Sequence, residues 1–208
     1  MRTVTTTETI YKFAELPTES AKDRARDWLR SCAEVDDITR SILEPIQTAA
    51  QLLGITIGTR RGTQSEIAIW WDTNPIDGGF DGDWSSERRP VCGFGAAIRA
   101  EFPTDAVLHS VADRLDAAAL ANKAADPGGD GYAYAAVSTH SRSMSFVDVR
   151  VSFDESTEDT IRDAVRAFSG WIGTLANSEA EHQSSNDYID DMLTANNYEF
   201  TGGGEFYT

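Results

Sequence analysis

Hydrophobic residues recur every three to four positions over several stretches of the chain, which is the spacing of one face of an α-helix. The first stretch follows Thr18 and runs to Cys32, and the second runs from about Asp36 to Gly54. Thr18 suits the N-cap of the first helix, because its hydroxyl can accept from the free backbone N–H groups of the first turn. Pro45 interrupts the second stretch, so we expect a kink or a fresh helix start there.

Further helices are expected in the second half of the chain. Thr104 is placed to cap a helix whose apolar stripe ends at Ala119. Ser156 opens the stretch with the strongest helical period, and Ser178 and Ser185 offer two more helix starts near the C-terminus. The last of these helices would bury one apolar stripe and leave acidic residues over its remaining surface.

Apolar runs rich in β-branched and aromatic residues predict strands between the helices. The expected strands cover residues 9–13, 55–57, 66–71, 92–102, 132–137 and 144–153, with a terminal hairpin or frayed end over 198–207. A long loop rich in Gly and Asp is expected over 72–90. Because the strands mostly follow one another as hairpins, the pattern predicts an α+β fold in which about four to five helices pack an antiparallel or mixed sheet. A chain of 208 residues fits a single domain, 1–208.

Negative charge is concentrated in the last quarter of the chain. The sequence has 34 acidic and 18 basic residues, which gives a formal net charge of −16. From Asp154 onward there are 12 Asp and Glu but only two bases, Arg162 and Arg166. We therefore expect an acidic helical portion from about residue 155, which repels nucleic-acid and membrane phosphates and attracts basic protein surfaces.

This acidic portion admits several interpretations. The residues predicted to bind a basic partner there are Glu179, Glu181, Asp187, Asp190 and Asp191. A helix rises about 1.5 Å per residue and duplex DNA carries about one charge per 1.7 Å, so an acidic helix can also imitate nucleic acid. The alternatives are a solvated helix face, calcium binding, and a general salt adaptation that would spread acid evenly along the chain.

An aspartate-rich segment near the middle of the chain is the second candidate site. Its four carboxylates could converge on a hard cation such as calcium or magnesium: Asp72, Asp77, Asp81 and Asp83. The spacing is not that of an EF-hand, and a plain turn is the alternative, because loops use Asp and Gly for their backbone conformations. Asp83 and Trp84, the latter if partly exposed, are predicted to offer the basic partner a second contact.

Motifs for catalysis are weak, so the sequence favours a protein that is not an enzyme and needs no cofactor beyond that cation. His109, His140 and His182 form no metal pair at helical spacing and stand in no nucleophile motif. His140 is expected at a polar hairpin tip. Cys32 and Cys92 lack the paired spacing of a zinc site and are expected to be buried free thiols.

No apolar run approaches the roughly 20 residues of a membrane span, and the first residues contain no apolar run like a signal-peptide core. We therefore expect a cytosolic protein.

Five segments, in order and over nearly the whole chain, resemble a family of uncharacterised proteins common in tailed phages and prophages. They are Tyr11–Leu16 with the following helix around Trp28, then Ala50–Ile55, Asp77–Gly82, His140–Ser145 and Asn197–Thr201. Members of that family are sometimes labelled antitoxins of a toxin–antitoxin stability system. In the family the central loop is a Ser-Gly-rich run, whereas here Trp71 to Pro75 stand in its place.

The resemblance implies a phage origin and an accessory role in the host cytoplasm, and it brings no catalytic residues with it. Together with the acidity, it favours a non-enzymatic protein that inhibits or regulates a bacterial host protein. Such a role would be counter-defence, host takeover or antitoxin-like binding, with nucleic-acid mimicry as one means. A metal-binding protein or metal-dependent enzyme, and a virion or assembly component, are the alternative functions.

Overall fold

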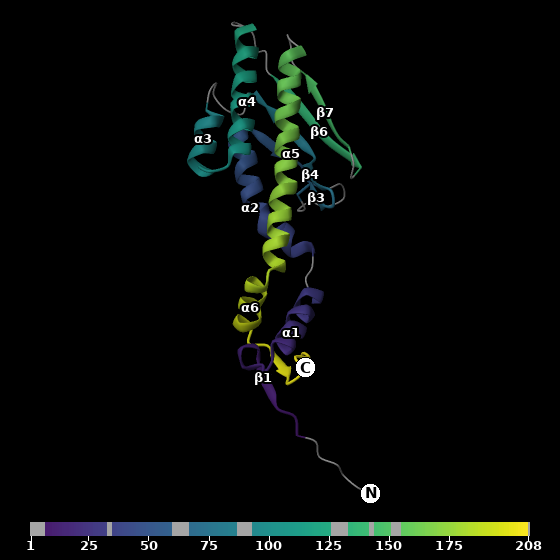
Figure 1. Ribbon diagram of the computed structural model, residues 1–208. Helices are drawn as coiled ribbons and strands as arrows, with labels where there is room; N and C mark the ends of the chain where they lie inside the picture. The colour runs from purple at the N-terminus through teal and green to yellow at the C-terminus, as the bar shows by residue number, and fades with distance from the viewer. Residues whose placement is uncertain are drawn as a thin grey trace. The chain divides into compact units, whose positions relative to one another are not determined.

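The structure, a computed structural model, describes residues 7–32, 35–59, 67–86, 93–125, 133–141, 144–150 and 155–207. Its helices and antiparallel strands form an α+β fold, as predicted (Figure 1). The chain, which we expected as one domain, forms two compact units. Unit 1 combines Met1–Ser41 with Ser178–Thr208, and unit 2 is Ile42–Asn177.

Unit 1 brings together elements from both ends of the chain. They are β1 (Ile10–Lys12), a 3-10 turn η1 (Phe13–Glu15), α1 (Glu19–Cys32), α6 (Asn186–Ala195) and β8 (Glu199–Thr201). β1 and β8 pair antiparallel with Tyr11 opposite Phe200, which the sequence did not predict. The predicted terminal hairpin is confirmed, because the Thr201 N–H donates to the Glu205 carbonyl at 2.8 Å.

The core of unit 1 lies between α1, α6 and the β1–β8 pair. Its buried residues are Phe13, Leu16, Ala21, Ala25, Ile189, Leu193 and Phe200. Trp28 stacks on Phe206 with ring centroids 4.0 Å apart. Thr18 caps α1 as predicted, since its Oγ1 accepts from the Ala21 N–H at 3.1 Å. The expectation of a buried Cys32 is wrong: it is the last residue of α1 and is exposed, while Cys92 lies outside the described residues.

Two long helices continue through positions at which the sequence allowed a new helix start. α2 spans Val35–Leu53 with Pro45 inside it, and α5 spans Glu155–Ser184, so Ser178 starts no new helix. In α2 the burial of Ile42 and Ile46, on either side of Pro45, supports helical continuity. That burial offsets the roughly 3 kcal/mol that an internal proline costs.

Unit 2 contains a four-stranded antiparallel sheet and a separate hairpin. The sheet has the order β2 (Ile55–Ile57), β5 (Gly82–Ser85), β6 (Tyr134–Ser141) and β7 (Met144–Arg150); the hairpin is β3 (Ile69–Thr73) with β4 (Ile76–Phe80). The long loop predicted over 72–90 is therefore wrong, because β4 and β5 lie within it. Gly78 in β4 lies so close to the backbone of α5 at Gly173 that neither position has room for a Cβ.

The segment that we predicted as a strand over 92–102 is instead helix α3, Phe94–Glu101. A distant residue stabilises it: the carboxylate of Asp116 accepts from the N–H groups of Gly93, Phe94 and Gly95 at 2.9 to 3.2 Å. A carboxylate at a helix N-terminus satisfies free N–H groups and complements the helix dipole.

Helix α4, Ala106–Ala125, follows α3 and packs on it. Its cap is Asp105 rather than the predicted Thr104, since Asp105 Oδ1 accepts from the Leu108 N–H at 2.9 Å. The other oxygen of Asp105 accepts from Trp171 Nε1 at 2.7 Å, which ties the start of α4 to α5. The apolar stripe predicted for α4 is buried, and with α5 it forms much of the unit 2 core (Figure 1).

Candidate functional site

Helix α6 carries the predicted partner-binding aspartates. Ser185 caps it, because its Oγ accepts from the Tyr188 N–H at 3.3 Å, as its predicted role as a helix start requires. Ile189 and Leu193 are buried in the unit 1 core, so the opposite side of α6 faces solvent. Asp187 and Asp191 are exposed there, one helical turn apart.

Asp190 has a different environment, because Arg26 of α1 binds it. Arg26 Nε lies 2.7 Å from Asp190 Oδ1, and Nη2 lies 2.8 Å from Oδ2, so the pair is bidentate. The Arg26 side chain is only 9% exposed and that of Asp190 is 33% exposed. The charge of Asp190 is therefore balanced within unit 1 and contributes little to attracting a partner.

The same guanidinium also holds two carboxylates of its own helix. Arg26 Nη1 donates to Glu19 Oε1 at 2.6 Å and to Asp23 Oδ1 at 2.8 Å, and its Cζ lies 5.6 Å from the Phe13 ring centroid. The hydrogen bond to Asp190, followed by those to Glu19 and Asp23, raises the pKa of Arg26, although burial acts in the opposite direction. Arg26 therefore keeps its positive charge among these three carboxylates.

Three exposed carboxylates of α1 were missed by the sequence analysis. Glu19, Asp23 and Asp27 repeat every four residues, and their side chains are 66%, 61% and 74% exposed. Arg30 Nη1 contacts Asp27 at 2.9 Å, and its Nη2 donates to Asn186 Oδ1 of α6. The signal in the sequence was the four-residue spacing of these acids, which places them on one side of a helix.

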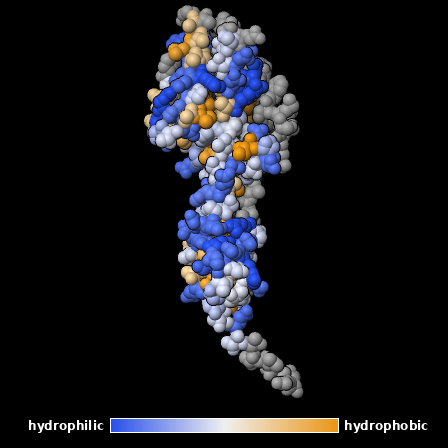
Figure 2. Space-filling model, in the orientation of Figure 1, coloured by the Kyte–Doolittle hydropathy of each residue, from blue (hydrophilic) through white to orange (hydrophobic). Residues whose placement is uncertain are grey.

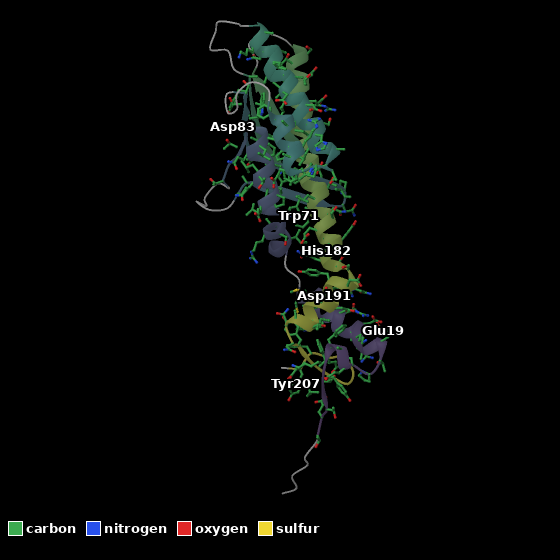
Figure 3. All side chains as sticks on the ribbon, turned by 90° about the vertical axis from the view of Figure 1, so that its left-hand side faces the viewer. Glu19, Trp71, Asp83, His182, Asp191 and Tyr207 are labelled. Atoms are coloured by element: carbon green, nitrogen blue, oxygen red, sulfur yellow. The ribbon has the colours of Figure 1, made fainter. Side chains whose placement is uncertain are left out.

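These residues define an acidic face shared by α1 and α6. It comprises Glu19, Asp23, Asp27, Asp187, Asp190 and Asp191, with Arg26 and Arg30 between the two helices. Figure 3 labels Glu19 on α1 and Asp191 on α6, and in Figure 2 the surface over this part of unit 1 is mainly hydrophilic. Six carboxylates against two guanidinium groups leave the face negative.

Glu179 and Glu181, the other predicted partner-binding residues of this region, lie in the last turns of α5. Glu179 is half-buried and accepts from Gln183 Nε2 at 2.7 Å, whereas Glu181 is exposed. Both belong to unit 1, whose residues 178–208 contain seven acids and no Lys or Arg. Residues 1–41 of the same unit contain eight acids and seven bases, so unit 1 carries half of the total charge of −16.

Trp84 cannot be the contact residue that we predicted. It is fully buried in the unit 2 core, and its Nε1 donates to the Leu53 carbonyl at 3.0 Å. Strand alternation explains this burial, because β5 turns Trp84 toward the helices. Asp83, its neighbour on β5, is half-buried and lies opposite Thr56 of β2.

The four aspartates of the predicted cation site are spread over different strands. Asp72 and Asp77 lie opposite each other on β3 and β4, and each uses Oδ1 to accept from a nearby backbone N–H. Asp81 follows β4, and Asp83 belongs to the other sheet. Within the described ranges, no group of three or more His, Cys, Asp or Glu is arranged to hold a metal ion.

The histidines occupy unrelated positions. His109 Nε2 lies 2.7 Å from the Phe102 carbonyl and lines an open hollow of about 480 Å³ with Asp113 and Arg114. His140 is the next-to-last residue of β6, at the end of the β6–β7 hairpin that the sequence predicted, and the ring centroids of His182 and Tyr188 lie 5.0 Å apart. The three histidines thus belong to three different elements, α4, β6 and α5.

Comparison of the chain with protein-family models, with curated proteins and with solved structures found no match. In the part of the chain that the structure describes, no helix combines the length and apolarity needed to cross a bilayer. The acidic face is thus the candidate site with the clearest chemical character.

Proposed function

We propose that this protein is a non-enzymatic binding protein that docks a basic surface of another protein through the acidic face of α1 and α6. The supporting observations are the exposure of Asp187 and Asp191 on α6 and of three carboxylates on α1, two helices that the Arg26–Asp190 pair joins. The C-terminal segment of this unit has no Lys or Arg. Long-range attraction from such a surface speeds the encounter with a basic partner and disfavours acidic ones.

The partner we propose is a bacterial host protein whose basic surface grips nucleic acid. The α1 carboxylates are four residues apart, which corresponds to about 6 Å along the helix axis. One strand of duplex DNA presents a charge about every 3.4 Å, so the three α1 carboxylates have roughly half of the linear charge density of a DNA strand. The α6 aspartates add further negative charge. A phage-encoded protein acting in the host cytoplasm, in counter-defence or as an antitoxin-like inhibitor, fits this chemistry and the resemblance of the sequence.

The test is capture of a partner by matched variants. Asp187→Asn with Asp191→Lys removes charge from the acidic face, and Asn at position 187 keeps the first turn of α6 free of a positive charge. The control, Asp163→Asn with Glu101→Lys, makes the same change of net charge at exposed positions of unit 2. Each protein is used as bait in a host lysate at low and at high ionic strength, and the captured partner is then titrated calorimetrically.

We expect the face variant to bind the partner about ten-fold more weakly, because two exposed charge pairs are lost and one becomes repulsive. The control should bind like the wild type. Equal weakening of both variants would show that only net charge matters, and unchanged binding of the face variant would reject the acidic face as the docking surface.

A further inference from the structure

We draw no further inference here: the strongest candidate, the exposed apolar surface patch on α4 formed by Ala117, Leu120, Ala121 and Ala124, carries none because nothing in the structure shows what covers it.

Discussion

The buried Arg26–Asp190 pair makes a strong prediction about what holds unit 1 together. Replacing Asp190 by Leu leaves Arg26 Nε and Nη2 without their acceptors in a side chain that is 9% exposed. An unsatisfied buried charged donor costs more than a neutral one, which itself costs about 1–3 kcal/mol. Because Glu19 and Asp23 still bind Nη1, we expect a total loss of about 3 kcal/mol, at the lower end for a broken buried pair.

Replacing the other member of the pair, Arg26→Met, should lower the stability of unit 1 by less than Asp190→Leu does. It leaves three carboxylates behind, but those of Glu19 and Asp23 are more than half exposed and Asp190 is one-third exposed, so water can hydrate them. A methionine side chain can also pack against the Phe13 ring. We expect a loss of about 1–2 kcal/mol. The double variant removes both charges from the pair and should lie within about 1 kcal/mol of the wild type.

Native-state hydrogen exchange can follow unit 1 by itself. The amides of Thr201 and Tyr207 are hydrogen-bonded in the terminal hairpin, so their exchange reports the opening of unit 1. A loss of about 3 kcal/mol corresponds to exchange that is roughly 150-fold faster. Amides of α4 in unit 2 provide the internal control and should be unchanged.

Two results would refute this reasoning. Exchange at Thr201 and Tyr207 that is unchanged in Asp190→Leu would mean that the pair contributes nothing to the stability of unit 1. If the double variant Arg26→Met with Asp190→Leu were as unstable as Asp190→Leu alone, the loss of stability would not come from a buried Arg26 guanidinium without its acceptors.

Three further predictions concern other parts of the chain. Gly173→Ala would place a Cβ within the backbone of Asp77 and Gly78, so it should destabilise the protein by about 1–3 kcal/mol. Gly170→Ala, which has open space around it, should instead stabilise α5 by up to about 1 kcal/mol. Thermal melting compares the two variants, and equal effects would contradict the close approach of β4 to α5. The hydrogen bond from Arg99 lowers the pKa of Asp113, so the stabilisation from this pair is complete above about pH 4 and is lost as the pH falls further. Arg99→Gln should therefore lower the melting temperature at pH 6 and lower it progressively less as the pH falls below about 4, and an equal loss at every pH would count against the pairing. Calcium or magnesium should leave the melting temperature of the wild type unchanged, since Asp72, Asp77 and Asp83 lie on three different strands and Asp81 lies between β4 and β5. A rise in melting temperature that Asp72→Asn abolishes would contradict this and support the cation site.

Elements with a strong local signal could be predicted from the sequence. The apolar stripes of α4 and α6 have the helical period over several turns, and Thr18 and Ser185 cap helices where their residue type suggests. These features depend on neighbours along the chain, so periodicity and side-chain chemistry suffice to find them.

Three of the failures share a different cause, since each depends on a residue far away in sequence. Helix α3 is capped by Asp116, more than twenty positions later, and a local reading could not supply that acceptor. Trp84 was predicted as a contact because its neighbours are acidic, but the Leu53 carbonyl binds its indole inside the core. Only the α6 part of the acidic face was predicted. The α1 part was missed, because the hydrogen bond from Arg26 to Asp190 joins α1 to a helix more than 150 positions later.

The pairing of β1 with β8 has a consequence for synthesis on the ribosome. Tyr11 can pair with Phe200 only after residue 200 has been translated, and Arg26 of α1 can bind Asp190 of α6 only after residue 190. Until then α1 presents Arg26 without the Asp190 that later binds it. A product that ends before α6 would therefore keep the α1 carboxylates but lack Asp187, Asp190 and Asp191, so it could not form the acidic face that the two helices share.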